Sequence, residues 1–281
     1  YVKQAVGVCM AMLMAVSAGE YSGMIVQAAE NQEAGGDIAP VYEAGNVVQK
    51  EDGTLYYWEY DGSSFEGSAS SGNYKPIIGE TNKLMMQSPS GEKTMIGDME
   101  GGGSLALTDG SLIFYEKPVD KIGGCEICSI DQNSGQTQTY GPGRIEASDG
   151  KKIICSDTSN QCIDSIDAET GERTKLADGT FLTGYEGLIY YQPTEADTNA
   201  AIRGKVTLSV MDAQGGQQKT LCTTEPDLYS DDWQEASSIM SMVFKEEYIY
   251  FSYGSFEGAT FSYSGGKIMK VKKDGTEAEV V

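Results

Sequence analysis

A short unit of alternating hydrophobic and polar positions recurs five times along this chain. In its clearest copy Asp109-Gly110 runs into Ser111-Leu112-Ile113-Phe114-Tyr115, the pattern of a tight turn followed by a half-buried strand. Another alternating run precedes each turn, so every copy predicts a hairpin of two strands, A and B. The B strands end at Tyr56-Tyr57, Phe114-Tyr115, Ile154-Cys155, Tyr190-Tyr191 and Tyr250-Phe251.

A second hairpin is predicted after each of these. Its mark is a glycine between two further short runs, because glycine fits the positive-φ position of a hairpin loop at little cost. We name the strands of this hairpin C and D. The five glycines are Gly91, Gly135, Gly171, Gly216 and Gly275.

The spacing of the hairpin pairs predicts a repeat architecture. The glycines follow one another at intervals of 36 to 59 residues, and a four-stranded unit of about 40 to 50 residues is the period of propeller blades. One such sheet cannot bury both faces alone, so blades stack radially. We predict an all-β fold, a β-propeller of about five four-stranded antiparallel blades that is either incomplete or closed with an extra strand. A sandwich or barrel of unrelated hairpins is the alternative.

The N-terminal residues have the pattern of a secretory signal. Lys3 precedes an apolar run from Ala5 to Ala18, and Val26-Gln27-Ala28 resembles a cleavage site. We predict a signal peptide over residues 1–28 and a secreted, extracellular protein, with association with the cell envelope as a variant of that prediction. An uncleaved anchor is the alternative, although polar residues and a glycine interrupt the run before it reaches about 20 residues.

A linker and the propeller domain follow the signal. Residues 29–44 lack apolar periodicity, which is typical of a flexible linker. The segment from Ile38 to Tyr42 is expected to add a strand to the last blade and so help to close a ring. The propeller domain spans 45–281, with repeats at approximately 45–98, 104–141, 143–178, 180–222 and 238–281.

The charge of the chain narrows the range of partners. The 281 residues include 20 Lys and Arg against 42 Asp and Glu, a net charge of −22. Such a chain repels phosphate backbones and anionic headgroups, so nucleic acid and membrane surfaces are not expected as partners. The acidity serves either solubility or the attraction of cations and basic partners.

Five cysteines follow Cys9, and in an exported protein an odd number leaves one unpaired. Cys155 ends strand B of the third repeat and Cys162 begins its strand C. They form either a disulfide across the two strands or two small buried thiols. Cys125 and Cys128 have redox-motif spacing, but residues three apart on a strand point to opposite faces. We therefore expect no redox or zinc role for them.

The chain contains no histidine, which excludes Ser-His-Asp and Cys-His catalysis and every histidine-based metal triad. No phosphate-binding loop, dinucleotide glycine pattern or calcium-loop spacing appears. A pair of carboxylates for glycoside hydrolysis stays open, because a propeller can bring remote acids together. We name no catalytic residue and expect no enzyme, with a carbohydrate-active hydrolase or lyase as the alternative.

The lengths of the connections predict a working face. Connections from A to B and from C to D are tight, whereas those from B to C and from D to A vary, and the latter two emerge on the same side of a blade. Insertions confined to one side of a repeat array usually mark its binding face. The variable segments are 61–82, 117–124, 192–205, 223–238 and 252–266.

Two of these segments share the sequence Ser-Phe-Glu-Gly after a tyrosine. If five blades close a ring, the first and fifth are neighbours and the two loops lie side by side. Such side chains can stack on a sugar or pack against a peptide, and a remnant of duplication without a role is the alternative. The predicted ligand-binding residues are Tyr60, Phe65 and Glu66 in the first repeat and Tyr253, Phe256 and Glu257 in the fifth.

An acidic segment precedes the fifth repeat. It holds Glu225, Asp227, Asp231 and Asp232 together with Trp233, and carboxylate oxygens at this density can bind calcium. The segment lacks calcium-loop spacing, so a solvated acidic loop is the stronger interpretation. We expect no cofactor, leave calcium open, and add Trp233 to the predicted ligand-binding residues.

The B strands and the C to D hairpins resemble those of a known family. The pattern Asp-Gly-x-Leu/Ile-x-Tyr, followed by hairpins ending in Asp-Gly-Thr or Thr-Gly-Glu, is similar to that of secreted proteins of Gram-positive, clostridia-like bacteria. The propeller repeats of those proteins resemble low-density-lipoprotein receptor-related propellers. Tyr57-Trp58-Glu59-Tyr60-Asp61 is also loosely similar to the Tyr-Trp-Thr-Asp signature of the receptors. The resemblance covers about residues 45–281 and implies an extracellular or envelope-associated binding scaffold without catalytic residues; the receptor propellers usually have six blades.

The sequence thus predicts a secreted or envelope binding scaffold. Its variable-loop face is expected to hold a glycan, a peptide or an envelope or host protein, and the chain is expected to be a monomer. Two alternatives stay open. One is a propeller-based hydrolase or lyase with a carboxylate pair, and the other is a structural or assembly scaffold.

Overall fold

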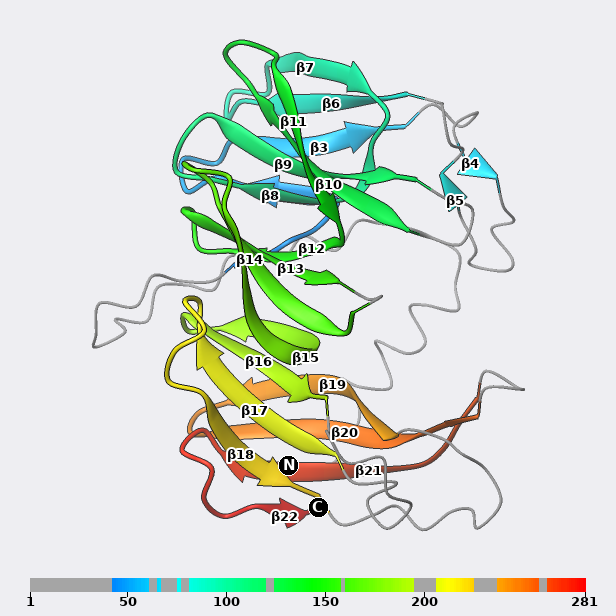
Figure 1. The fold of residues 1–281 in the computed structure, drawn as a ribbon, viewed down its shortest axis with the longest axis vertical. Coiled ribbons are helices and arrows are strands. Elements are labelled where there is room, and N and C mark those ends of the chain that lie inside the picture. Colours follow the sequence, from blue (N-terminus) through cyan, green and yellow to red (C-terminus); the bar gives the residue numbers. More distant parts are fainter. Residues whose placement is uncertain are drawn as a thin grey trace.

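The strands assemble into four-stranded antiparallel sheets that stack one on the next, which is the architecture of a β-propeller (Figure 1). Every regular element in the described part of the chain is a β-strand, and no helix there is long and apolar enough to cross a membrane. The computed structural model describes residues 42–60, 65–66, 75–76, 81–119, 124–157, 160–194, 206–224, 237–257 and 262–281.

Five blades follow one another in chain order, each with strands A to D as neighbours. The first contains β2 (Val47–Gln49), β3 (Leu55–Glu59), β6 (Asn82–Gln87) and β7 (Lys93–Met99). The second contains β8 (Gly102–Leu107), β9 (Leu112–Pro118), β10 (Cys125–Asp131) and β11 (Thr137–Pro142). The third contains β12 (Arg144–Ser148), β13 (Lys152–Asp157), β14 (Cys162–Asp167) and the first part of β15 (Arg173–Tyr185). The fourth contains the rest of β15, β16 (Leu188–Pro193), β17 (Thr207–Asp212) and β18 (Lys219–Thr223). The fifth contains β19 (Ser237–Lys245), β20 (Tyr248–Glu257), β21 (Ser262–Lys272) and β22 (Glu279–Val280).

The third and fourth blades share one strand. β15 pairs with β14 up to Asp178 and with β16 from Gly179 onward. Gly179 has a φ of 154°, and a Cβ placed there would lie 2.4 Å from the backbone oxygen of Gln192. Only glycine therefore lets the chain pass from one blade to the next here without a loop.

Carboxylates close the C to D turns. Asp131, at the end of β10, accepts hydrogen bonds at Oδ1 from the backbone N–H groups of Asn133 (3.0 Å) and Ser134 (2.8 Å). Asp167 accepts one from the N–H of Thr170 in the same way (2.8 Å). Such Asx turns hold the chain reversal locally, so part of the acidity of the protein serves its turns.

The predicted turn glycines are confirmed in four blades and displaced by one residue in another. Gly91, Gly135, Gly171 and Gly275 all have a positive φ. In the fourth blade Gly215, not Gly216, takes that conformation, with a φ of 78°. Gly215 occupies the turn position of Gly275, since its N–H donates to the carbonyl oxygen of Asp212 (3.0 Å) as that of Gly275 donates to the carbonyl oxygen of Lys272 (2.8 Å).

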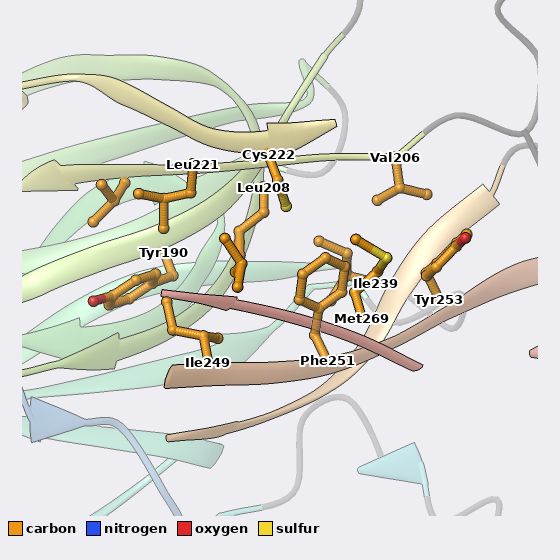
Figure 2. Close-up of a cluster of buried hydrophobic side chains, with 12 residues drawn as sticks. Tyr190, Val206, Leu208, Leu221, Cys222, Ile239, Ile249, Phe251, Tyr253 and Met269 are labelled. Carbon is orange, nitrogen blue, oxygen red and sulfur yellow. The ribbon is translucent and has the colours of Figure 1, made fainter. Parts of the chain in front are cut away.

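Four hydrophobic clusters fill the spaces between consecutive blades. Figure 2 shows the cluster between the fourth and fifth blades, where Tyr190 and Leu208 face Phe251 and Met269. Burying one such side chain contributes about 1.5 to 3 kcal/mol. Contacts between blades, more than within any one sheet, therefore make up the core.

The entering segment pairs with a different blade from the one predicted. β1 (Tyr42–Glu43) pairs with Ser148 and Ala147 of β12 in the third blade, so the prediction of an extra strand on the last blade is wrong. Gly45 then exchanges backbone hydrogen bonds with Leu105 of β8 (3.2 and 2.8 Å). The chain enters along the A strands of the second and third blades, whose open edges accept its hydrogen bonds.

The first and fifth blades are not neighbours. Figure 1 shows the first blade at one end of the longest axis and the fifth blade at the other. The closed ring that would bring the two Ser-Phe-Glu-Gly segments side by side is therefore wrong. Of the entering segment, the described residues Tyr42 and Glu43 pair with the third blade.

Candidate functional site

The two sides of the blades differ in their connections. We call the side of the B to C and D to A connections the loop side, and the side of the A to B and C to D connections the turn side. The turns gather at the left of Figure 1, and all of them lie within the described ranges. The long connections between strands, such as those from Pro193 to Thr207 and from Thr223 to Ser237, are on the loop side. The long, variable connections and the uniform turns are thus on opposite sides.

Tyr60 stands at the loop-side end of β3, as predicted. Its side chain is partly exposed, and its hydroxyl shares a hydrogen bond with the backbone of Gly103 in the next blade. Burial raises the pKa of Tyr60 to about 12, and the nearby carboxyl of Glu116 acts in the same direction. Tyr60 therefore joins the first blade to the second beside an acidic group.

Tyr253 lies elsewhere than predicted. It is fully buried in the cluster between the fourth and fifth blades (Figure 2), and its buried hydroxyl has no hydrogen-bond partner among the described residues. The alternation of β20 explains this, since Ile249, Phe251 and Tyr253 share the face that packs against the fourth blade. Tyr253 is a packing residue, and its ring is not available as an exposed platform.

The other predicted ligand-binding residues are placed only in part. β4 (Phe65–Glu66) pairs with β5 (Lys75–Pro76), and Phe256 and Glu257 end β20. The structure does not describe the side chains of these four ligand-binding candidates. Trp233 and the acidic segment with Glu225, Asp227, Asp231 and Asp232 also lie outside the described residues. Within those residues no cluster of Cys, Asp or Glu could hold a metal ion.

A buried carboxyl group lies at the loop-side end of the second blade. Glu116 of β9 is 6% exposed, and its Oε1 accepts a hydrogen bond from the N–H of Ile145 in the third blade (2.9 Å). Gly103 makes room for it, since a Cβ at this glycine, whose φ is +75°, would lie 2.6 Å from Oε2. Glu116 therefore bridges two blades through a space that glycine keeps open.

The surroundings of Glu116 set its protonation. Burial raises its pKa from 4.5 to about 6, opposed by the hydrogen bonds from Ile145 and Ser104 and by the positive charge of Arg144. The negative charge of Glu146 adds to the rise. A carboxyl group that titrates near neutral pH can store or deliver a proton, and it also holds the second and third blades together.

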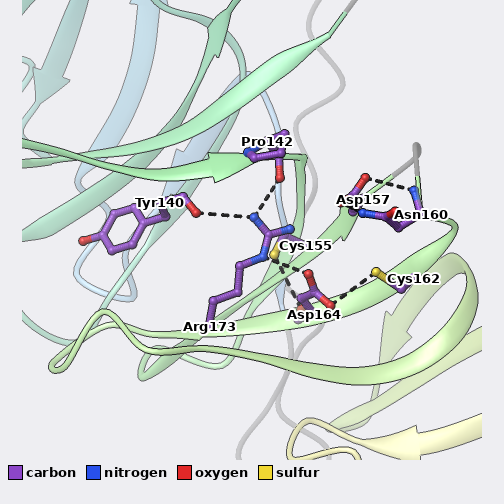
Figure 3. A network of polar contacts seen from close by, with 8 residues as sticks. All are labelled: Tyr140, Pro142, Cys155, Asp157, Asn160, Cys162, Asp164 and Arg173. Carbon is purple, nitrogen blue, oxygen red and sulfur yellow. Dashed lines mark hydrogen bonds and ion pairs between the residues drawn. The ribbon is translucent and has the colours of Figure 1, made fainter.

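A second polar network ties the third blade to the outer strand of the second (Figure 3). Nε of Arg173 donates to Oδ2 of Asp164 (2.8 Å), and Nη1 donates to the carbonyl oxygens of Pro142 (2.7 Å) and Tyr140 (3.4 Å). The guanidinium thus pairs with a buried carboxylate and satisfies carbonyl groups at the end of β11. This network positions one blade against the next.

The two cysteines of this network are free thiols, so the structure has the second of the two predicted arrangements. Cys155 donates to the backbone oxygen of Asp164 (3.6 Å), and Cys162 to its Oδ1 (3.4 Å). Burial raises the pKa of Cys155 to about 12 and that of Cys162 to about 11. Both stay protonated near neutral pH and are weak nucleophiles.

Neither Glu116 nor the pair of Arg173 and Asp164 was predicted from the sequence. A signal for Glu116 was present, because it occupies a blade-facing position of strand B where the first blade has Trp58. A charged residue at a core position marks a buried polar site. Arg173 carried no such signal, since it begins strand D and its partners come from another repeat.

No family model matches the chain, and no curated protein matches it. Among solved structures it is similar to the beta-propeller domain of the Trilobed protease from Pyrococcus furiosus, with 10% identity and a TM-score of 0.42 over 85% of this chain and 71% of that chain. It is also similar to TolB from Acinetobacter baumannii, with 14% identity and a TM-score of 0.35 over 87% of this chain and 66% of that chain. A chain of a nidogen/laminin complex is similar with 9% identity and a TM-score of 0.32 over 80% of this chain and 92% of that chain. The fold follows from the sheets themselves, and the similarity to receptor-related propellers stays a prediction.

Proposed function

We propose that this chain is a binding scaffold without catalysis that holds a glycan, a peptide or an envelope protein on its loop side. One observation carries the proposal: all long connections leave the blades on one side, while hydrogen-bonded turns close the other. Repeat proteins bind through the side on which their connections vary. The rigid interfaces between blades provide the support that such loops need.

The polar network around Arg173 supports a positioning role and not chemistry. Arg173 is held by Asp164 and two carbonyl oxygens, and the two thiols beside it stay protonated. These groups fix one blade against the next. Recognition is therefore assigned to the variable segments. The proposed contacts are Phe65 and Glu66 at the first blade and, as a separate contact, Phe256 and Glu257 at the fifth blade, because these two blades lie at opposite ends of the array (Figure 1).

Export is part of the proposal. The sequence of residues 1–28 has the pattern of a secretory signal, and the net charge of −22 suits partners other than nucleic acid. A partner in the envelope or outside the cell follows from this. Fusing residues 1–28 to a reporter and measuring its export tests this part alone.

The binding proposal is tested with residues 29–281, which include every residue that the structure describes. The protein is applied to an array of mucin, plant and cell-wall glycans, with and without calcium, and to an envelope extract. Selective binding that is lost in the Phe65→Ala/Phe256→Ala variant, at an unchanged melting temperature, supports the proposal. Binding that this variant retains refutes the assignment of the contacts.

Glu116 favours one second candidate. A carboxyl group whose pKa is about 6 at the loop-side end of a strand has the protonation that a general acid needs near neutral pH. A hydrolase or lyase on this fold would use it with a second carboxylate. Turnover of a glycan by the wild type that disappears in Glu116→Gln would establish this candidate and displace the first.

A further inference from the structure

A fifth strand lies on the strand A edge of the third blade. The first, second and fifth blades are four-stranded sheets, whereas the third blade, β12 to β15, also carries β1 (Tyr42–Glu43) beside its strand A. Four strands suffice for a blade in this protein, so β1 is not needed to complete the third one. A strand added at the edge of a complete sheet pairs with the N–H and C=O groups that the edge offers.

Residues 42–45 pass from the edge of the third blade to that of the second. The N–H of Ala44 donates to the carbonyl oxygen of Glu146 in β12 (2.8 Å). The next residue, Gly45, exchanges two backbone hydrogen bonds with Leu105 in β8 (3.2 and 2.8 Å). We call residues 42–45 the strap, and the strand A edges of β8 and β12 that it follows the composite edge.

A bulge lies in each of the two strands at the point where the strap is bound. In β12 the register with β13 shifts between Ile145 and Ala147, and Glu146 is the extra residue. In β8 the register with β9 shifts between Gly102 and Leu105. Bulges interrupt the ladder of their own sheet and are frequent beside functional sites. The two bulges thus present backbone groups of both blades to the strap.

Hydrogen bonds that do not involve the strap hold the composite edge together. The hydroxyl of Ser148 in β12 donates to the carbonyl oxygen of Leu107 in β8 (2.7 Å). The N–H of Asp109 donates to the carbonyl oxygen of Gly150 (2.7 Å) and joins the same two blades. The two edges therefore keep their relative position when the strap is absent. A binding site that is formed in advance costs less ordering entropy when it is filled.

The strap shows which side chains the composite edge accepts. Ala44 packs against the hydrophobic cluster between the second and third blades, and Gly45 follows it without a side chain. Peptides that add a strand to a sheet edge gain affinity from main-chain hydrogen bonds and specificity from the space for individual side chains. The composite edge fits an extended peptide with small residues at these two positions.

We propose that the composite edge is a peptide-binding site, which the strap occupies in cis and from which an extended peptide of another protein displaces it. The four strands of the third blade stay paired when the strap leaves. This site lies at the strand A edges and is additional to the loop-side contacts of the proposed function. The strap competes with a peptide at an effective concentration in the order of millimolar, so the wild type binds free peptide weakly.

A fluorescein-labelled peptide with the sequence of residues 38–47 tests the proposal by fluorescence anisotropy. The protein is residues 29–281, either as wild type or as Ala44→Pro/Gly45→Pro, which removes two N–H donors of the strap. The variant should bind the peptide about tenfold more tightly than the wild type, because its strap no longer competes. A control peptide with Ala44→Pro should bind to neither protein, because it cannot donate to Glu146.

Three results of this titration overturn the proposal. A variant with an unchanged melting temperature that binds no peptide up to about 1 mM shows that the edge accepts no strand from outside. Equal binding to wild type and variant, or equal binding of the two peptides, places the peptide elsewhere. The loop-side variant Phe65→Ala/Phe256→Ala should bind the peptide like the wild type. Loss of peptide binding in that variant would place the peptide on the loop side, whereas a failure to bind glycans or envelope proteins leaves the composite edge unaffected.

Hydrogen exchange in the wild type tests the opening of the strap without a substitution, and it decides the question if the double proline variant does not fold. The N–H of Leu105 donates to Gly45 of the strap, whereas that of Asp109 donates to Gly150 of the next blade, at similar distances (2.8 and 2.7 Å). If the strap leaves while the blades stay together, the Leu105 amide exchanges about tenfold faster than that of Asp109, after correction for intrinsic rates. Equal protection of the two amides would show that the strap opens only with the blades and would overturn the proposal.

Discussion

Glu116 makes the stability of this protein depend on pH in a direction opposite to that of an ordinary ion-paired carboxylate. Its carboxyl is 6% exposed, and burial raises its pKa from 4.5 in the unfolded chain to about 6 in the folded one. Between these values the folded state binds more protons than the unfolded state. The free energy of unfolding therefore falls as the pH rises through this window.

The magnitude follows from the two pKa values. A rise from 4.5 to about 6 corresponds to about 2 kcal/mol. This contribution favours the folded state below pH 4.5 and is lost above about pH 6. Glu116→Gln keeps the size of the side chain and an oxygen that can accept from the N–H of Ile145, but it cannot titrate. The variant therefore lacks this part of the pH dependence.

The assay is urea unfolding of wild type and Glu116→Gln at several pH values from about 4 to about 7.5. The difference between the two proteins isolates Glu116 from the other acidic groups, because those titrate in both. We expect the stability of the wild type to fall relative to the variant by about 2 kcal/mol across the series. Parallel curves would refute the reasoning, since they would mean that Glu116 titrates alike in the folded and unfolded states.

Three further changes test other parts of the fold. Leu208→Ala, in the cluster of Figure 2, should lower the free energy of unfolding in urea by about 2 to 5 kcal/mol, whereas Val119→Ala on the surface should change it by less than about 0.5 kcal/mol. Gly179→Ala should lower the melting temperature because its Cβ would lie 2.4 Å from the backbone oxygen of Gln192; an unchanged melting temperature would show that the shared strand tolerates a side chain. The Ser111 hydroxyl and the turn amides lower the pKa of Asp131 from 3.8 to about 2, so its stabilisation is present above pH 3.8 and lost as the pH falls toward 2. Asp131→Asn should lack this acid-dependent loss of stability, measured by circular dichroism as the pH is lowered. An identical loss of stability in wild type and variant would contradict this assignment to Asp131.

The hairpins were predictable because their signals are local. The pair Phe114-Tyr115 and its four counterparts alternate between the two faces of a strand, and Gly135 marks the turn that follows. Each of these features depends on residues within one repeat. Repetition at a regular interval then indicated blades before any contact between them was known.

Features that depend on contacts between repeats were not predictable. The pairing of Tyr42–Glu43 with the third blade depends on which A-strand edge is open. The burial of Tyr253 depends on how the fourth and fifth blades pack against each other. Glu116 finds its donor, Ile145, 29 residues further along the chain. The open arrangement of the blades depends on the ends of the array, which repeat periodicity does not describe. The predicted loop contacts stay predictions.

The central claim, that the loop side binds and the turn side does not, is tested most directly by comparing two variants in one binding measurement. Phe65→Ala/Phe256→Ala changes the loop side, and Asn133→Ala/Glu169→Ala changes two exposed residues of C to D turns. Both are measured by surface plasmon resonance against the glycan or envelope protein that the wild type captures. The account predicts that only the loop-side variant loses binding. Loss of binding in the turn-side variant with retention in the loop-side variant would contradict it.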